Sequence, residues 1–354
     1  MCGIRTDVEV AETPAGVRPA SGGPPRPRTG GASQARIPDF FIVGHQKCGT
    51  TALYLMLRSH PQIFMSTVKE PRFFATDHRS QRTRRGAPPV AQRPQTLDAY
   101  LSLFAAAGDE RRVGEASGQY LRSTTAASGI GALQPAARII AILREPASFL
   151  RSFHLQMVSS RVETETDFQM AIAREGDRRA GKRIPRSCHN REPLLYSDHV
   201  RYVEQLRRFH AVFPPEQVLV LIYEDFRRDN EATVRTVQRF LEVDDTHPID
   251  AIETKPVNAV RSVALNQLLG MGRRARNNPS AATRLERTVN ALTPMILKQD
   301  VFRKRWRRLI YKEPLPPDEE FMFELRRRFK PEVQAVSDYL GRDLVSLWGY
   351  DDVG

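Results

Sequence analysis

The stretch FFIVGHQKCGTT, residues 40–51, decides the fold. Its first four residues, Phe40 to Val43, form a continuous apolar run, which is typical of a buried parallel strand. A loop with two glycines follows, and residues 52–57 continue as a helix that ends near His60-Pro61. A strand, a glycine-containing loop and a helix in this order place backbone N–H groups and a helix N-terminus around an anion. The stretch therefore predicts a phosphate site in an α/β domain.

The same alternation of strand and helix recurs further along the chain. Apolar runs predict three more strands, over residues 113–115, 138–143 and 218–223. Helical periodicity predicts two more helices, over residues 147–158 and 230–241. Strands that alternate with helices imply a parallel sheet with helices on both faces. We therefore expect a three-layer α/β sandwich with a P-loop-like nucleotide-binding fold, a central parallel sheet of about five strands, and residues 40–43 and 138–143 as neighbouring strands.

Composition sets the domain boundaries. Residues 1–36 are rich in Pro, Gly, Ala and Arg and lack periodic apolar residues, which predicts a disordered tail before a single domain over residues 37–354. Residues 80–94 are expected to form an exposed loop, and residues 261–312 are basic with a helical pattern. No run approaches the ~18 apolar residues of a membrane helix, and the N-terminus lacks the apolar segment of a secretory signal. A cytoplasmic location is therefore expected.

The net charge indicates the class of binding partner, and the cysteine content indicates the redox compartment. The chain of 354 residues has a net charge of +13, which favours a nucleotide, a nucleic acid, an acidic glycan or a membrane surface. The chain has three cysteines, an odd number, and they show no C-x-x-C spacing. A disulfide framework is therefore not expected, which is consistent with a protein in a reducing compartment.

The loop resembles a Walker A loop but departs from it. Gly44 and Gly49 have the spacing of the two Walker A glycines, and Thr51 occupies the position of the magnesium-binding hydroxyl. In Walker A the lysine follows the second glycine directly, whereas here Thr50 does so and Lys47 lies inside the loop. The pattern indicates a phosphate-binding loop with a cation that differs from an ordinary ATPase loop.

Two motifs together resemble the sulfotransferases that use 3′-phosphoadenosine-5′-phosphosulfate (PAPS). Residues 44–53 are similar to the 5′-phosphosulfate loop of that family, in which the lysine also lies two residues before the Gly-Thr pair. Arg144 ends an apolar run and Ser152 follows eight residues later, as in the family's 3′-phosphate element. An arginine there can hold a phosphate with two hydrogen bonds, and the serine can add a hydroxyl donor. The resemblance implies a set of PAPS-binding residues, namely Gly44, Lys47, Cys48, Gly49, Thr50, Thr51, Ala52, Arg144 and Ser152.

Weaker similarities extend the resemblance over about residues 39–350 and point to the heparan-type and bacterial carbohydrate branch. The segment KEPRFF, residues 69–74, resembles the segment that carries the catalytic glutamate in that branch. The segment GEASGQY, residues 114–120, resembles its E-K-[ST]-x-x-Y stretch, but Ala116 replaces the lysine that is often found there. Residues 223–226 and 344–348 resemble later family segments. A lysine contribution from position 116 is therefore not expected.

This resemblance implies a sulfuryl transfer from PAPS to a hydroxyl or an amine of a small-molecule, carbohydrate or glycoconjugate acceptor, without a required metal. Lys47 would stabilise the leaving phosphate, and Glu70 would act as the general base. His154 and Glu115 are the alternative bases. Cys48 is interpreted as a small filler, although a thiolate beside a lysine at a helix N-terminus is chemically conceivable.

Two other functions compete with this interpretation. A P-loop kinase or NTPase would account for the glycine spacing and could use Glu224-Asp225 as a Walker B element, but it does not require the pair of Arg144 and Ser152. A basic nucleic-acid-binding protein would account for the charge, but the sequence contains no RRM, KH, zinc-finger or homeodomain signature. No specific nucleic-acid partner is therefore expected.

Overall fold

The computed structural model describes residues 36–78, 93–185, 187–188, 190–250, 252, 259–260 and 311–354. Most of the predicted tail, of the loop predicted over 80–94 and of the basic segment over 261–312 lies outside these residues. Among the helices in the described ranges, none combines the length and the apolar composition that a bilayer span requires.

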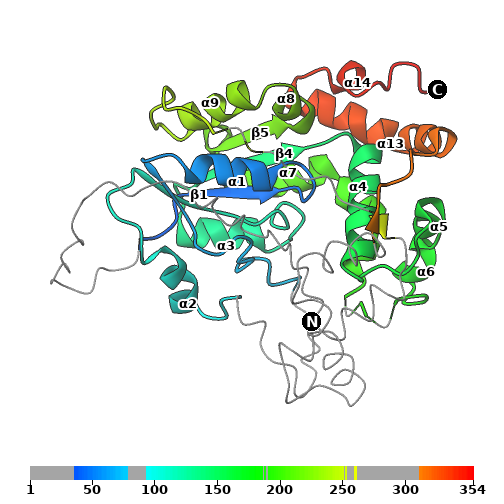
Figure 1. The fold of residues 1–354 in the computed structure, drawn as a ribbon, viewed down its shortest axis with the longest axis horizontal. Helices are drawn as coiled ribbons and strands as arrows, with labels where there is room; N and C mark the ends of the chain where they lie inside the picture. Colours follow the sequence, from blue (N-terminus) through cyan, green and yellow to red (C-terminus); the bar gives the residue numbers. More distant parts are fainter. Residues whose placement is uncertain are drawn as a thin grey trace, which may run out of the picture.

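Five parallel strands form the central sheet, in the order β2-β3-β1-β4-β5 (Figure 1). Their bounds are Phe40–Gly44 for β1, Ile63–Met65 for β2, Arg112–Ala116 for β3, Arg138–Leu143 for β4 and Val218–Ile222 for β5. β1 lies in the middle, with Phe41 opposite Glu115 of β3 and Ile139 of β4. The predicted parallel sheet is thus confirmed, and so is the pairing of residues 40–43 with residues 138–143.

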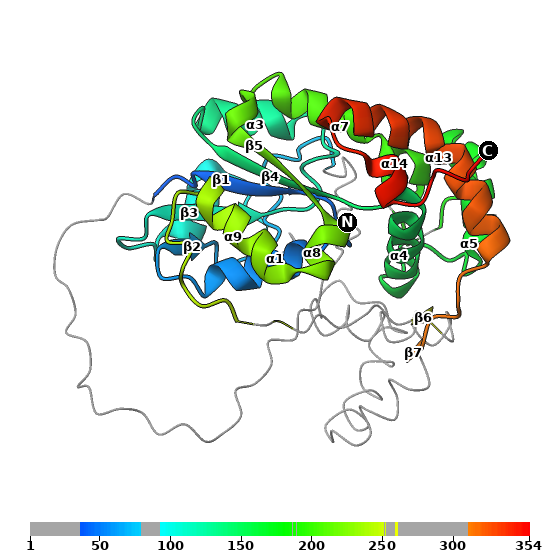
Figure 2. The ribbon, with the colours of Figure 1, turned by 90° about the horizontal axis from the view of Figure 1, so that it is seen from above.

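Helices cover both faces of the sheet, as Figure 2 shows. One face carries α1 (Thr50–Arg58), α8 (Tyr223–Arg228) and α9 (Asn230–Phe240). The other carries α3 (Ala126–Leu133) and α7 (Tyr202–His210), and the long helix α13 (Glu319–Leu340) packs on α7 and on α4 (Pro146–Ser159). α13 ends at Gly341, whose φ of 60° fits the left-handed conformation of a glycine C-cap. The three-layer α/β fold is the one that the sequence predicts.

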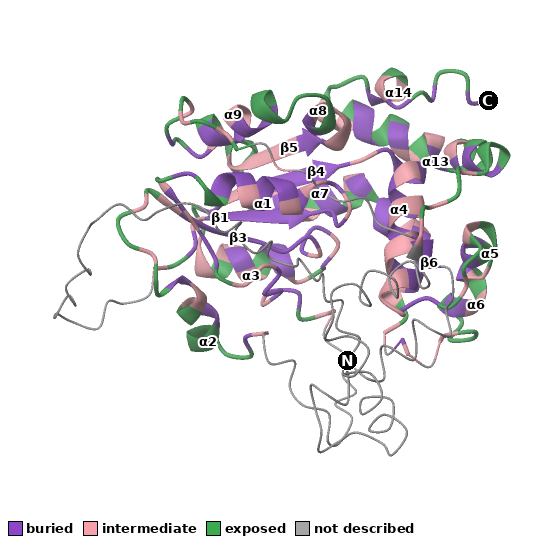
Figure 3. Ribbon diagram, in the orientation of Figure 1, coloured by how far each residue is buried: buried purple, intermediate pink, exposed green. Residues whose placement is uncertain are grey.

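The core lies between these layers (Figure 3). All five residues of β1 are buried, which explains why its sequence is a continuous apolar run and not an alternating one. The two predicted helices 147–158 and 230–241 correspond to α4 and α9. The strand predicted over 218–223 ends at Ile222, because Tyr223 already begins α8.

Shorter elements complete the described structure. Their bounds are α2 Leu97–Leu101, α5 Phe168–Ala173, α6 Glu175–Arg179, α14 Leu344–Leu347, the 3-10 helices η1 Ser102–Phe104, η2 Glu192–Leu194, η3 Tyr196–Val200 and η4 Pro215–Gln217, and the antiparallel strands β6 Ala259–Val260 and β7 Tyr311–Lys312. The region 160–195 contains α5, α6 and η2, together with a buried ion pair between Arg178 and Glu163 at 2.6 Å.

Candidate active site

The phosphate loop occupies the C-terminal end of the central strand. Gly44 ends β1 so close to Leu121 that a Cβ atom at this position would lie 2.6 Å from that side chain. Leu121 in turn donates its backbone N–H to the carbonyl of Val43 at 2.7 Å. The chain after β3 therefore crosses over the end of β1, and glycine at position 44 allows this close approach.

The helix N-terminus after the loop is open. Gly49 is the N-cap of α1 with a φ of 82°, and no side chain caps the helix. Leu53 makes the first helical hydrogen bond, to the carbonyl of Gly49 at 3.0 Å, and the first turn of α1 has no acidic residue. The backbone N–H groups of residues 50–52 therefore have no partner among the described residues, and together with the helix dipole they suit an anion.

We predict that Gly49→Ala destabilises the protein by more than the ~1–2 kcal/mol that a left-handed conformation costs a residue with a side chain. A Cβ atom at Gly49 would lie 2.8 Å from the ring of Phe226, so a steric cost adds to the backbone cost. Gly181→Ala is the matched control, because Gly181 has a φ of 79° and nothing within 4 Å of its Cβ position. Urea denaturation of both variants measures the difference, and equal losses would contradict a close contact at Gly49.

Lys47 presents a free amine at this loop. Its backbone adopts a left-handed φ of 64°, its side chain is half-buried, and its Nζ makes no hydrogen bond or ion pair with a described residue. Burial, followed by the charge of Arg144, lowers the pKa of Lys47 to about 8. A lysine that is partly desolvated and unpaired is positioned to meet the negative charge of a ligand.

Arg144 and the phosphate loop are in direct contact. Arg144 follows β4 and donates from Nη1 to the carbonyl of Lys47 at 3.0 Å, while its guanidinium lies 4.6 Å from the centroid of the Tyr223 ring. Its buried Nε has no hydrogen-bond partner within the described part of the chain. Ser152 lies on α4, half-buried, and its hydroxyl has no partner among the described residues either. The two predicted motifs thus belong to one site with unused donors.

Glu70 is buried, but its environment differs from the predicted one. Its φ of 59° is left-handed, whereas the following Pro71 predicts an extended backbone, so that prediction is wrong. The carboxylate pairs with Arg72 and, at 3.3 Å, with Lys69. Burial acts to raise the pKa of Glu70, but the charges of Arg72 and Lys69 outweigh it and bring the pKa to about 2. The pKa of Glu70 therefore lies below the ordinary value of a glutamate, and the carboxylate is ionised at neutral pH.

Glu115, one of the two alternative bases, is enclosed by its own side-chain network. It is fully buried in β3 and accepts hydrogen bonds from Tyr100 at 2.8 Å, Tyr120 at 2.7 Å and Ser117 at 2.8 Å. Burial raises the pKa of Glu115 to about 7, against the effect of these hydroxyl donors. Because three hydroxyl groups surround the Glu115 carboxylate, we interpret its role as structural.

This network also supports the segment that carries Glu70. Glu70 donates its backbone N–H to the carbonyl of Ala116 at 2.9 Å, and Arg72 donates its own to the Ser117 hydroxyl at 3.0 Å. Ser117, Tyr120 and Arg72 were not predicted as site residues. The resemblance of residues 114–120 to a family segment was the available signal, but it does not reveal which of these side chains faces residues 70–72.

The other candidate residues have structural surroundings. His154, the second alternative base, has both ring nitrogens in hydrogen-bond contact, with Tyr196 Oη at 3.0 Å and the Thr166 carbonyl at 3.2 Å. Burial raises the pKa of the Cys48 thiol to about 12, so it stays protonated and fits the interpretation as a filler. Glu224 accepts the indole N–H of Trp348 at 2.9 Å. Among the described residues, no cluster of three or more His, Cys, Asp or Glu side chains is arranged to hold a metal ion.

Fold and site together define an α/β protein with an open helix N-terminus and, within the described residues, unpaired basic side chains at the end of its central strand. Comparison with known families identifies the particular kind. The sequence profile of the sulfotransferase family matches residues 38–247. The chain belongs to the sulfotransferase family, which confirms the resemblance found in its sequence and the class of enzyme that it implied.

Individual relatives fit this assignment. The chain is 29% identical to human bifunctional heparan sulfate N-deacetylase/N-sulfotransferase 3 over 217 residues, which cover 59% of this chain and 22% of that protein. It is 27% identical to human carbohydrate sulfotransferase 15 over 245 residues, covering 58% of this chain and 44% of that protein. The chain thus spans less than half the length of these curated relatives. The crystal structure of a sulfotransferase from Alicyclobacillus acidocaldarius matches with a TM-score of 0.54 and 29% identity, covering 77% of this chain and all of that one.

Proposed function

We propose that this protein transfers a sulfuryl group from PAPS to a hydroxyl or an amine of a carbohydrate, glycoconjugate or natural-product acceptor. The observation that carries the proposal is the contact between Arg144 and the carbonyl of Lys47, which unites the two nucleotide motifs in one site. The relatives named above include a carbohydrate sulfotransferase and a heparan sulfate N-sulfotransferase, which supports a glycan acceptor and leaves both O- and N-sulfation open.

The unused donors of the site fit PAPS. The N–H groups at the start of α1 and the hydroxyls of Thr50 and Thr51 would hold the 5′-phosphate. The Arg144 guanidinium, with its unpartnered Nε, and the Ser152 hydroxyl would hold the 3′-phosphate. When bound, PAPS supplies the sulfuryl group, and adenosine 3′,5′-bisphosphate remains as the product.

The residues of this chain then have separate tasks. Lys47 places a positive charge where negative charge develops on the leaving phosphate oxygen, so its contribution is largest in the transition state. Glu70 accepts the proton of the acceptor hydroxyl, and Arg72 and Lys69 keep its carboxylate ionised and fixed in orientation. Glu115, through Ser117, positions the segment that carries Glu70.

A P-loop kinase remains the main competing function, and the contacts of Glu224 argue against it. A Walker B carboxylate has to be free to hold magnesium, whereas Glu224 accepts hydrogen bonds from Trp348 and, at 3.3 Å, from the backbone N–H of Glu145. Incubation of the protein with radiolabelled PAPS and a glycan and metabolite library tests the proposal directly. Label should pass to an acceptor, and parallel incubation with γ-labelled ATP should yield none. The opposite pattern of labelling would favour the kinase.

We predict that Arg144→Ala removes most of the preference for adenosine 3′,5′-bisphosphate over AMP. The variant loses a charge-assisted hydrogen bond to the 3′-phosphate, worth roughly 1.5–3 kcal/mol, while AMP has no 3′-phosphate to lose. The shift of the melting temperature with each nucleotide measures the two affinities by mass action. Arg179→Ala is the control, because its side chain is 53% exposed and forms surface ion pairs only. A wild-type ratio of affinities in Arg144→Ala would place the 3′-phosphate elsewhere.

A further inference from the structure

A small pocket lies beside the phosphate loop, on the side of residues 117–122. His45 and Gln46 of the loop line it, together with Gly118, Arg122, Phe149 and His199. Its enclosed volume is about 10 Å³, which is enough for one oxygen-sized group. Aromatic rings and polar side chains both line it, and most of the lining residues named here are buried.

Three side chains of this pocket carry polar atoms without partners. Gln46 is 7% exposed, and its amide Nε2 has no hydrogen bond within the described residues. His199 is 3% exposed, and its Nε2 likewise has no hydrogen bond within the described residues. The guanidinium of Arg122 makes neither a hydrogen bond nor an ion pair with any described residue. Buried polar atoms are normally paired, so the two buried unpaired atoms of Gln46 and His199, next to the unpaired Arg122 guanidinium, indicate a missing ligand.

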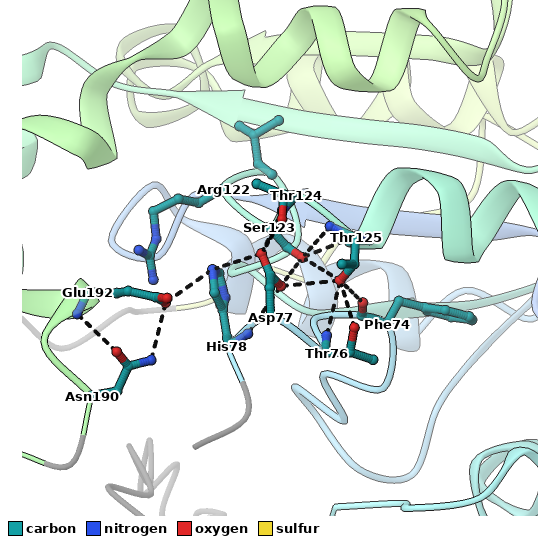
Figure 4. Close-up of polar contacts among 12 residues, drawn as sticks. Phe74, Thr76, Asp77, His78, Arg122, Ser123, Thr124, Thr125, Asn190 and Glu192 are labelled. Atoms are coloured by element: carbon teal, nitrogen blue, oxygen red, sulfur yellow. Dashed lines mark hydrogen bonds and ion pairs between the residues drawn. The ribbon is translucent and has the colours of Figure 1, made fainter. Parts of the chain in front are cut away.

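Arg122 remains unpaired although carboxylates are close, as Figure 4 shows. The two oxygens of Asp77 already accept hydrogen bonds from Ser123 at 2.6 Å and from the backbone and hydroxyl of Thr124 at 2.7 and 2.9 Å. Glu192 accepts one from Asn190 at 3.2 Å and faces His78 at 3.7 Å. These carboxylates partly balance the charge of Arg122 from a distance, but they leave its N–H groups free.

The charge balance inside the pocket favours an anion. Burial lowers the pKa of His45 to about 4 and holds that of His199 well below its usual range, so both rings are neutral at pH 7. The donors around the pocket then include the Arg122 guanidinium and the Gln46 amide. The unpaired Nε2 of His199, which is a donor or an acceptor according to the tautomer, can pair with a hydroxyl group next to the anionic one.

The pocket adjoins both reactive residues. Gln46 directly precedes Lys47, and a Cβ atom on Gly118 would lie 3.1 Å from the backbone nitrogen of Gln46. Ala116 and Ser117, just before Gly118, are the residues that hold the backbone of Glu70 and Arg72. A molecule that presents its nucleophile between Lys47 and Glu70 therefore has the pocket within reach of a neighbouring substituent.

We propose that Arg122 and Gln46 bind one oxygen atom of an anionic group, a carboxylate or a sulfate ester, that the acceptor carries beside the hydroxyl or amine that is sulfated. The proposal rests on the proposed sulfuryl transfer, since it assigns this pocket to the acceptor of that reaction. Arg122 thereby becomes a residue that determines specificity and takes no part in the chemical step. An acceptor without an anionic group leaves the Arg122 guanidinium unpaired. Such an acceptor should therefore bind less tightly than one that carries the anionic group.

We predict that a sugar acid stabilises the protein through Arg122. The protein is saturated with adenosine 3′,5′-bisphosphate, and its melting temperature is measured with D-galacturonate and with D-galactose at equal concentration and ionic strength. Galacturonate should raise the melting temperature more than galactose does. Arg122→Gln should abolish the difference and Arg122→Lys should retain part of it, while Arg201→Gln, at a side chain that is 60% exposed and pairs with Glu204, should leave it unchanged.

Nucleotide binding separates failure of this inference from failure of the proposed function. Without a shift by adenosine 3′,5′-bisphosphate in the wild-type protein, the proposed function itself is wrong. With such a shift, equal melting temperatures in the two sugars, or an undiminished difference in Arg122→Gln, would overturn the assignment of the pocket. A loss of nucleotide affinity in Arg122→Gln with an unchanged sugar difference would assign Arg122 to the donor and would also overturn it.

Discussion

Replacing Lys47 by alanine is expected to lower turnover by about 10²–10³-fold, the usual cost of removing one preorganised donor from a developing anion. Lys47 is the half-buried cation of the phosphate loop, and its Nζ has no partner among the described residues. In the ground state the helix N-terminus and Arg144 already hold the nucleotide, so the affinity for adenosine 3′,5′-bisphosphate should change little. The negative charge that Lys47 stabilises develops as the leaving phosphate oxygen is released. Removing the Lys47 amine should therefore lower the rate constant of the transfer step.

Rate and binding are measured separately, by single-turnover transfer of labelled sulfate and by titration with the bisphosphate. Lys182→Ala, at an exposed turn, is the matched control and should behave as the wild type. Losses of equal size in affinity and in rate would show that Lys47 is a general phosphate anchor and would remove it from the chemical step.

The pKa of Lys47 gives this assignment a pH signature. Burial and the neighbouring Arg144 bring the pKa down to about 8, and a lysine is charged only below its pKa. The value of kcat/KM reports the free enzyme, so it should fall as the pH rises through about 8. The nucleotide phosphates favour the charged amine, so the fall in kcat should occur at higher pH. Lys47→Arg should remove the alkaline fall, since a guanidinium stays protonated.

The fold was predictable because its core elements carry strong local patterns. β1 and β4 are continuous apolar runs, and their pairing followed from the alternation with helices. β2 was missed because three residues are too short for a period to show. α7 was also missed, although Tyr202, Leu206 and Phe209 recur at helical spacing and are all buried, so its pattern was readable.

Some residues of the candidate site could likewise be predicted from the sequence, and others could not. The loop of residues 44–51 and Arg144, which are in contact, could be singled out in the sequence because backbone geometry and spacing define both motifs, whereas the surroundings of Glu70 depend on contacts between side chains. A sequence shows that Lys69 and Arg72 flank Glu70, but not that both turn inward and pair with it. Arg122 was missed for a related reason: it becomes notable only because its neighbours, including Asp77 and Glu192, leave it without a partner.

The second large effect is expected at Glu70. Glu70→Gln keeps the shape of the side chain and removes its ability to accept a proton, so turnover should fall by roughly 10²–10⁴-fold while nucleotide affinity stays the same. The rate should show no acidic limb from Glu70 at ordinary pH, because its pKa is about 2. This differs from a carboxylate that desolvation alone controls, which would titrate above its usual range and impose such a limb.

Stability has to be measured with the rate, because Glu70→Gln breaks a buried ion pair. The substitution leaves the charge of Arg72, whose side chain is 4% exposed, without its partner, and such a loss costs about 3–5 kcal/mol. Arg72→Gln is the informative companion, since it breaks the same pair and retains the carboxylate. If Glu70 is the base, Arg72→Gln should lose comparable stability but far less turnover, and Glu70→Gln should be slow even well below its unfolding transition.

A Glu70→Gln protein that is folded and turns over like the wild type would exclude Glu70 as the base. Glu115 and His154, with their oxygen and nitrogen atoms already engaged in the core, would then be tested singly.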